Sequence, residues 1–265
     1  MSAVPAAALQ EPASERSLAG LARLYGEAGA RRIRGAHVAV VGIGGVGSWA
    51  AEALARSGVQ RLTLIDLDHV AESNLNRQIH ALTSTLGQAK VQAMADRIAL
   101  IQPGCAVHCV DDFAAPDNWP ALLPEPVTAV IDACDQVAAK AAIAAWALHS
   151  ETLCVTVGAA GGKQQAQRVE VADLCAVTHD PLLAKVRYRL RRHHGAARGA
   201  CDMGVTCVFS REAVAAPLDG TCDASPHDGS LNCHGYGSTV AVTATFGFCA
   251  AGWILQNVAA ARANL

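Results

Sequence analysis

The sequence predicts an α/β fold, a Rossmann-like, mostly parallel sheet with flanking helices and a C-terminal extension. Short β-branched runs alternate with longer alanine-rich stretches, which is the order that βαβ units require. A glycine-rich turn, GIGGVG, directly follows the first of these runs. Of the 265 residues 52% are hydrophobic and 17% charged, so the chain can bury a large core and a disordered protein is excluded.

Each expected element follows from the spacing of its apolar residues. The strands are short runs rich in Val, Ile and Leu, such as HVAVV, and the helices carry apolar residues every three or four positions, as Val91, Met94, Ile98 and Ile101 do. Strands are expected at 37–42, 61–66, 105–110, 127–131, 153–157, 166–171 and 205–209, and helices at 44–57, 88–101 and 136–149. A basic helix is expected between the last two strands.

The chain is expected to form one domain, 16–265, behind a flexible Ala/Pro-rich tail at 1–15. Within this domain, 165–238 is interpreted as a variable, substrate-facing insertion that adds to the sheet. We expect a buried C-terminal helix at 239–262. The alternative is a membrane span over the uncharged stretch 238–261, but Thr, Gly, Gln and Asn dilute its hydrophobicity.

Charge and cysteine usage limit the function classes. The formal net charge of −2 indicates no general affinity for polyanions, so a nucleic acid would have to meet a local basic patch. The ten cysteines do not predict a disulfide framework, because that inference applies to short secreted chains, and the N-terminus shows no secretory signal pattern. We expect reduced thiols and a cytoplasmic protein.

The glycine-rich turn predicts a nucleotide site. Gly42, Gly44, Gly45 and Gly47 open a helix after the first strand, where glycines allow a phosphate to approach the free N–H groups of the helix start. Asp66 ends the second strand, where a carboxylate can accept hydrogen bonds from ribose hydroxyls. The alternative, a tight turn without a ligand, leaves Asp66 unexplained.

Several charged residues indicate a triphosphate rather than a nicotinamide cofactor. Arg77 and Lys90 follow the ribose acid and can offset the charge of a leaving pyrophosphate. Asp135 lies after another strand, where a carboxylate can hold Mg²⁺ against phosphates. Taken singly, Arg77 and Lys90 could be surface cations and Asp135 a helix N-cap.

The motifs GIGGVGS, LIDLDHV, SNLNRQ, GQAK and IDACD resemble those of the ubiquitin-activating-enzyme-like adenylyltransferases. The segments ARLYG, NRQIHAL, HDPL, GVTCVFS and TVAVTATFGF are similar to one branch, the tRNA threonylcarbamoyladenosine dehydratases. This resemblance implies that ATP activates the carboxyl group of N6-threonylcarbamoyladenosine in tRNA, after which the side chain closes into a ring with loss of water. It also implies a homodimer, and a link to a cysteine desulfurase and its sulfur-acceptor protein.

The resemblance also implies roles for individual residues. Asp66 would bind ribose, with Asp68 as a further nucleotide contact. Asn74 and Arg77 would contact the phosphates, and Lys90 would neutralise the transferring adenylyl group. The resemblance implies that Asp135 holds Mg²⁺. Arg77, Lys90 and Asp135 are therefore the expected catalytic groups. An arginine from the partner subunit would complete the site, and either Arg16 or Arg23 could supply it.

Three alternatives remain open. One is adenylation of the C-terminus of a ubiquitin-like sulfur carrier, although the chain has no CxxC pair for the structural zinc that such relatives carry. The others are a non-catalytic nucleotide-binding scaffold for sulfur-transfer partners and a nicotinamide dehydrogenase. A catalytic cysteine is not required, because ring closure on an adenylated carboxylate needs no enzyme thioester.

A basic segment at 185–198 is the candidate tRNA interface. It carries six cations and no acid, while Leu182, Val186 and Leu190 recur every four residues, so one stripe of the helix can pack. The alternative is an ordinary solvated helix face. We expect phosphate contacts from Lys185, Arg187, Arg191 and Arg192.

Overall fold

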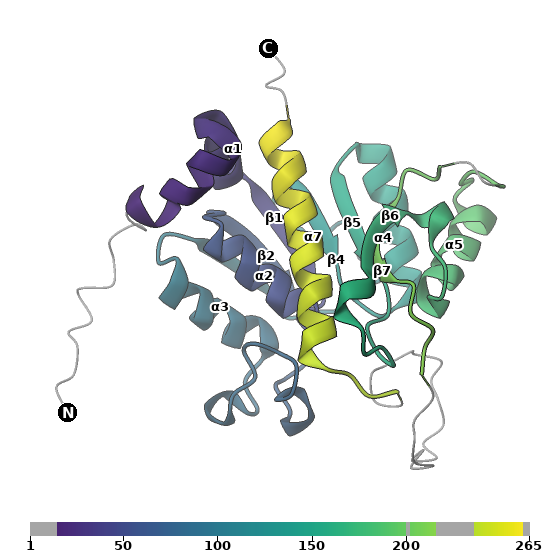
Figure 1. Cartoon of the computed structure of the whole chain (residues 1–265), viewed down its shortest axis with the longest axis horizontal. Coiled ribbons are helices and arrows are strands. Elements are labelled where there is room, and N and C mark those ends of the chain that lie inside the picture. The colour runs from purple at the N-terminus through teal and green to yellow at the C-terminus, as the bar shows by residue number, and fades with distance from the viewer. Residues whose placement is uncertain (1–14, 200–201, 216–235, 262–265) are drawn as a thin grey trace.

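The computed structural model describes residues 15–199, 202–215 and 236–261 (Figure 1). At its centre lies a seven-stranded sheet of order β3-β2-β1-β4-β5-β7-β6. All neighbouring strands pair in parallel except β6, which runs antiparallel to β7. The strands are β1 (His37–Val41), β2 (Arg61–Ile65), β3 (Ala106–Val110), β4 (Ala129–Asp132), β5 (Leu153–Val157), β6 (Val169–Asp173) and β7 (Thr206–Ser210). The predicted Rossmann-like, mostly parallel sheet is confirmed.

Helices cover both faces of this sheet. On one face lie α1 (Glu15–Gly35), α2 (Gly47–Arg56), α3 (Lys90–Ile101) and α7 (Val240–Ala260), and on the other lie α4 (Val137–Ser150) and α5 (Pro181–His193). Strand β1 shows the two layers, because Val38 and Val40 join the core under α2 and α7 while Ala39 and Val41 join the core under α4. Both faces are therefore apolar, as expected for a parallel sheet.

The first helix, α1, was not predicted from the sequence. It contains a break at Gly26, whose φ of 71° only glycine adopts without strain. The strand predicted at 166–171 begins later, at Val169, because Ala166–Arg168 forms a single 3₁₀ turn. The predicted tail at 1–15 lies outside the described residues except for Glu15.

Helix α7 runs across the sheet and packs against α1 and α2 (Figure 1). It is long and apolar enough to cross a membrane by length and composition alone, and half of that apolar stretch is buried in this fold. Its side chains Val242, Phe246 and Ile254 lie in the main core. A helix buried in a core carries such a sequence without a membrane.

The topology brings several loops to one edge of the sheet. The register pairs Val41 with both Ile65 and Asp132, so β1, β2 and β4 end side by side. Strands β5 and β7 continue the same edge, and the described parts of the predicted 165–238 region extend this sheet. Open parallel sheets place ligands at the carboxyl ends of their strands. We call this the carboxyl edge and the opposite one the amino edge.

Candidate active site

The glycine-rich turn forms the floor of the site at the carboxyl edge. Gly42 has a φ of 86° and donates its N–H to Ile65 O at 2.8 Å. A Cβ on Gly42 would lie 2.8 Å from Ala133 O, and one on Gly47 would collide with the Gly42 carbonyl, so the turn is too close for side chains. By contrast, the space beside Gly44 is open. An anion can therefore approach the start of α2, which no side chain caps among the described residues.

Asp66 joins the turn to the end of β2. Its Oδ2 accepts a hydrogen bond from Ile43 N at 2.6 Å, and its Oδ1 accepts one from Asp68 N at 2.9 Å. The residue is only 7% exposed, and burial raises its pKa, an effect that nearby Lys90 opposes. These two bonds fix the orientation of the carboxylate and leave lone pairs that can receive hydroxyl donors.

Lys90 brings a buried cation to the same carboxylates from the first turn of α3. Its Nζ lies 2.6 Å from Asp68 Oδ2 and 3.9 Å from Asp66 Oδ1. An antiparallel β-bridge between the backbones of His69 and Ala89 joins the two ends of the loop between Asp68 and Lys90. The structure thus brings Asp66, Asp68 and Lys90 together.

Asn74 and Arg77 lie on the loop above the glycine-rich turn. Asn74 is buried, and its Oδ1 accepts a hydrogen bond from Ala71 N, so part of its role is to form the loop. The guanidinium of Arg77 donates to Ser73 O at 2.6 Å, while its aliphatic stem would lie 3.3 Å from a Cβ on Gly45. Arg77 therefore lies directly against the turn that would receive the phosphates.

Asp135 follows β4 on the turn into α4. It is partly exposed, and within the described part of the chain its carboxylate accepts no hydrogen bond. A free carboxylate at this position fits the requirements of a Mg²⁺ ligand. Asp132, three residues earlier, does not, because it is fully buried and its Oδ1 is paired with Lys140 Nζ at 3.1 Å.

Two buried lysines near this edge were not predicted from the sequence. Lys140 stands in an alanine-rich helix and lies entirely inside the protein beside Asp132. Lys163 follows the glycine-rich segment after β5 and is also buried. In the sequence, Lys140 stands out only by its alanine-rich surroundings and Lys163 only by the glycines before it. Neither feature indicates which way the side chain points.

The described cysteines are poor nucleophiles. Burial raises the pKa of Cys105 to about 11, and hydrogen bonding to Asp173 raises that of Cys175 to about 11. The pKa is also raised at the remaining described cysteines, Cys109, Cys134, Cys154, Cys207 and Cys249. A reactive thiol needs a lowered pKa, so none of these is prepared for a thioester. Cys201, Cys222 and Cys233 lie outside the described residues.

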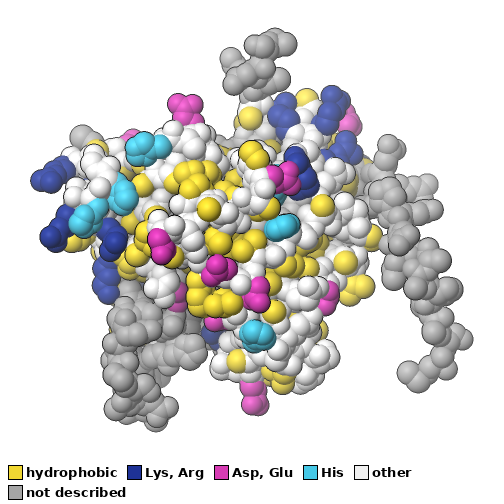
Figure 2. Space-filling view, turned by 180° about the vertical axis from the view of Figure 1, so that it is seen from behind, with side chains coloured by type: hydrophobic (Ala, Val, Ile, Leu, Met, Phe, Trp, Pro, Cys, Tyr) yellow, Lys and Arg dark blue, Asp and Glu magenta, His cyan; other side chains and the backbone are white. Residues whose placement is uncertain are grey.

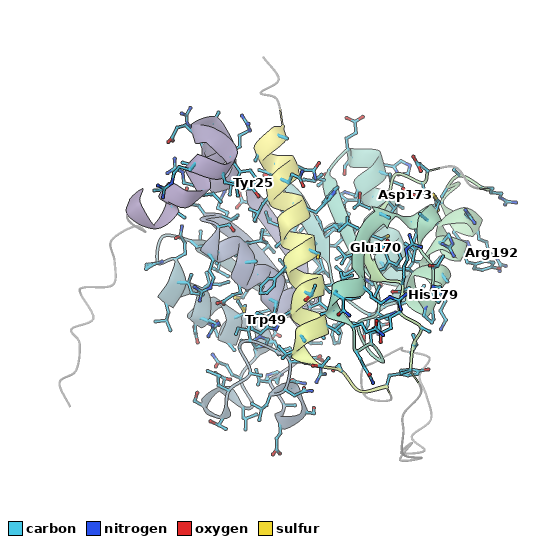
Figure 3. The ribbon with its side chains drawn as sticks, in the orientation of Figure 1. Tyr25, Trp49, Glu170, Asp173, His179 and Arg192 are labelled. Carbon is cyan, nitrogen blue, oxygen red and sulfur yellow. The ribbon has the colours of Figure 1, made fainter. Side chains whose placement is uncertain are left out.

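The basic helix α5 begins at the carboxyl edge and runs away from it. Asp180 caps its start through Leu183 N, and Figure 3 shows His179 and Arg192 near opposite ends of the helix. Lysine, arginine and histidine side chains gather on this part of the surface (Figure 2). The basic patch is therefore real, but most of it lies toward the amino edge.

Two of the four predicted tRNA contacts, Arg187 and Arg191, donate hydrogen bonds to main-chain carbonyls of their own chain. Arg187 donates to Leu174 O and Val177 O, both at 2.9 Å. Arg191 donates to Ala197 O and Gly199 O, both at 3.0 Å. A local pattern could not show these bonds because the acceptors lie on other segments. Lys185 and Arg192 are exposed, and Arg192 packs over the Tyr188 ring.

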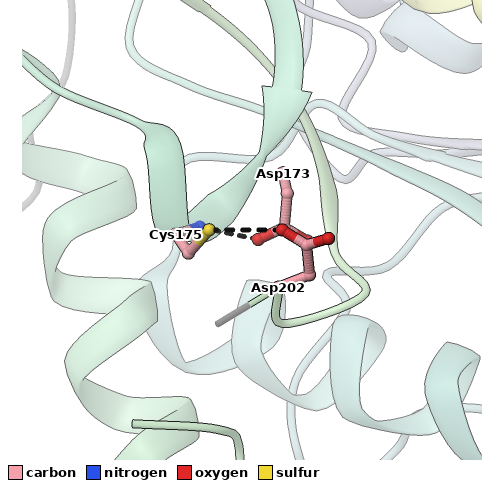
Figure 4. Close-up of side chains that lie close together, drawn as sticks. All are labelled: Asp173, Cys175 and Asp202. Carbon is pink, nitrogen blue, oxygen red and sulfur yellow. Dashed lines mark hydrogen bonds between the residues drawn. The ribbon is translucent and has the colours of Figure 1, made fainter. Parts of the chain in front are cut away.

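Asp173, Cys175 and Asp202 form a separate cluster at the amino edge (Figure 4). Asp173 accepts hydrogen bonds from Cys175 N, Met203 N and Val205 N, so its carboxylate fixes the path of the chain there. These bonds account for the position of Asp173 without an ion.

The two candidate arginines for the second subunit belong to α1. Leu18 packs near Gly58, just before β2 begins, so this part of α1 lies at the amino edge. Arg23 is exposed, and the side chain of Arg16 lies outside the described residues. Arg23 is therefore not near the carboxyl edge of its own chain.

The fold and the site define a nucleotide-binding class of α/β protein, and comparison with known proteins identifies the family. The ThiF family model matches residues 15–261, so the chain belongs to the ThiF family. It is 45% identical over 252 residues to a tRNA threonylcarbamoyladenosine dehydratase of Escherichia coli (strain K12), covering 92% of this chain and 94% of the relative.

Solved structures of the E. coli enzyme give the same result. The structure of E. coli tRNA N6-threonylcarbamoyladenosine dehydratase, TcdA, in complex with ATP is similar with a TM-score of 0.82 and 43% identity, over 92% of this chain and 94% of that one. The complex of the same enzyme with AMP has a TM-score of 0.83 at 43% identity and the same coverage. The resemblance stated from the sequence motifs is thereby confirmed.

Proposed function

We propose that this protein is an ATP-dependent tRNA N6-threonylcarbamoyladenosine dehydratase, which closes the threonylcarbamoyl side chain into a ring through an acyl-adenylate. The observation that carries the proposal is the arrangement of Asp66, Asp68 and Lys90 beside the glycine-rich turn. The E. coli relative with this fold is known in complex with ATP and with AMP. ATP is accordingly the nucleotide that we assign to this site.

The reaction proceeds in two steps. First, a carboxylate oxygen of the modified base attacks the α-phosphorus of ATP, and pyrophosphate leaves. Arg77 and Lys90 offset the negative charge that develops during this transfer. Then a nitrogen or oxygen of the same modified base attacks the activated acyl carbon, loses its proton, and expels AMP. AMP keeps one oxygen of the substrate carboxylate. The overall reaction therefore couples the cleavage of ATP into AMP and pyrophosphate to the removal of one water from the modified base.

Mg²⁺ is assigned to Asp135. The carboxylate is partly exposed at the carboxyl edge and accepts no hydrogen bond from the described residues, so it is available to an ion. When bound, the ion supplies positive charge against the phosphates. Lys140 keeps the neighbouring Asp132 out of this role by holding its carboxylate inside the protein.

The second step needs no enzyme thioester. Ring closure is intramolecular, so it requires confinement and the exclusion of water rather than a further nucleophile. The raised pKa of each described cysteine supports this route over that of cysteine-using sulfur-carrier activators.

We also assign a homodimer to this protein. Arg23 lies on α1 at the amino edge of its own chain, which supports a nucleotide contact from another copy of the chain. The tRNA is assigned to the basic patch of α5, with Lys185 and Arg192 as exposed cations on its surface. Cytoplasmic location and interaction with a cysteine desulfurase and its sulfur acceptor stay predictions.

The proposal is tested by incubating the protein with ATP and tRNA that carries N6-threonylcarbamoyladenosine, followed by mass analysis of the nucleosides. We expect a nucleoside lighter by one water, together with AMP and pyrophosphate in equal amounts. A carrier protein with a diglycine C-terminus serves as the competing substrate. Pyrophosphate release with the carrier but not with the tRNA would contradict the proposal.

A further inference from the structure

Lys163 is a buried cation held by three main-chain carbonyl groups. It is 2% exposed, and its Nζ donates to His179 O at 3.1 Å, Ser210 O at 3.3 Å and Glu212 O at 2.8 Å. These carbonyls belong to the segment before α5 and to the end of β7. One ammonium group thus joins three parts of the carboxyl edge that are distant in the sequence.

Two buried carboxylates balance this charge while bonding to the same segment. Asp180 is 4% exposed, and its Oδ2 accepts a hydrogen bond from Ala159 N at 2.9 Å. Glu212 accepts hydrogen bonds from Gln164 N and Gln165 N. Burial lowers the pKa of Lys163, while Asp180 and Glu212 oppose that shift and favour the charged form. The three charges therefore fix the course of residues 158–165.

Gly162, next to Lys163, connects this segment to the rest of the edge. Its N–H donates to Gly237 O at 3.0 Å, and its carbonyl accepts from Ala215 N at 2.8 Å. Its φ of 70° and the close approach of Val214 exclude a side chain there. Asn76 Nδ2, on the loop that carries Arg77, donates to Ser238 O at 3.1 Å. Through Gly237 and Ser238, Gly162 is thus connected to the loop that carries Arg77.

We propose that Lys163 is a positioning residue for ring closure, a built-in cation that holds residues 158–165 and their contacts beside the activated base. This inference rests on the proposed function. The nucleotide groups belong to the ends of β1, β2 and β4, whereas Lys163 joins the ends of β5 and β7, further along the same edge. Its loss leaves the glycine-rich turn, Asp66 and Lys90 in place. The loss of Lys163 instead loosens residues 158–165, the segment that must exclude water from the acyl-adenylate.

The test measures how much AMP forms for each cyclic nucleoside produced. For the wild-type protein we expect a ratio of one, because each adenylate closes into a ring. In Lys163→Ala we expect water to hydrolyse the adenylate, which regenerates the open-chain base and raises the ratio at least about 5-fold, while the KM for ATP stays within about 2-fold. Ethylammonium, which can replace the missing ammonium group, is expected to lower the ratio again.

Two further variants make the test specific. Lys163→Met keeps most of the side-chain volume without the charge, and we expect the same raised ratio, so the test stands if the alanine variant fails to fold. Gln167→Ala changes an exposed side chain just outside residues 158–165 and should keep a ratio of one. A wild-type ratio in a folded Lys163 variant, or equal losses of AMP and cyclic product, would overturn the inference. Failure of the wild-type protein to form any cyclic nucleoside would instead contradict the proposed function.

Discussion

Lys90 and Asp68 form a short ion pair of 2.6 Å at the carboxyl edge, and the same ammonium lies 3.9 Å from Asp66. One cation from α3 is therefore shared by the two carboxylates that follow β2. This places positive charge next to the glycine-rich turn before any nucleotide binds.

The first prediction concerns this cation. Replacing Lys90 by Met should lower the rate of pyrophosphate release with modified tRNA by about 100-fold or more, because the developing phosphate charge loses a fixed positive partner. Gln92→Ala, on the exposed face of the same helix, is the control and should keep the wild-type rate. An unchanged rate in Lys90→Met would remove Lys90 from the mechanism.

The second prediction concerns the buried pair of Asp132 and Lys140, which are both fully buried at an N–O distance of 3.1 Å. Lys140→Met should destabilise the fold by about 3–5 kcal/mol in urea denaturation, because it leaves an unpaired buried carboxylate. Adding Asp132→Asn should recover a large part of that loss. If the two substitutions are additive, the residues do not interact in the way that the structure indicates.

The third prediction is a dependence of stability on pH that arises from His80. This residue is 1% exposed, and neither ring nitrogen has a partner among the described residues. Burial lowers its pKa from 6.5 to about 4, with Lys90 and Arg97 contributing. Because the folded protein resists protonation more than the unfolded chain does, this contribution is present above pH 6.5 and is lost as the pH falls toward 4.

The size of the effect follows from that shift, and it should reach about 3 kcal/mol of unfolding free energy. The measurement is urea denaturation between pH 7.5 and 4.5 for the wild-type protein and for His80→Leu. The variant should lose less stability on acidification. Parallel curves for the two proteins would show that His80 does not carry this dependence.

The fourth prediction concerns tRNA binding by α5. Lys185→Ala with Arg192→Ala should weaken binding and reduce the slope of log K against log salt by about one to two, because each phosphate contact contributes about one unit. Arg31→Ala, an exposed arginine of α1, should leave the slope unchanged. A wild-type slope in the double variant would exclude this face from the interface.

Local patterns predicted the parts of the site that are themselves local. The glycine-rich turn, the strand before it and Asp66 were all predicted, because backbone approach to a phosphate requires glycine and a buried strand favours β-branched residues. Lys90 was predicted as a cation that follows the ribose acid and Asp135 as a carboxylate that follows another strand, while their individual roles came from the resemblance. In a parallel sheet, ends that are distant in sequence meet at one edge, so the topology supplied the rest.

Tertiary contacts account for what the sequence could not show. Arg187 resembled a free cation, but its acceptors are the carbonyls of Leu174 and Val177, which only the fold brings near. Lys140 stands among small apolar residues and Lys163 between two glycines and two glutamines, and no periodicity indicates that their ammonium groups point inward. Side-chain positions of this kind depend on partners far along the chain.

The central claim is that the site joins AMP to the carboxylate of the modified base. The most direct measurement uses tRNA whose threonylcarbamoyl carboxylate carries ¹⁸O at both oxygens, with mass analysis of the nucleotides after one turnover. The account predicts one ¹⁸O in the phosphate of AMP and none in pyrophosphate. Unlabelled AMP beside a cyclic nucleoside, or ¹⁸O in inorganic phosphate released with ADP, would contradict it.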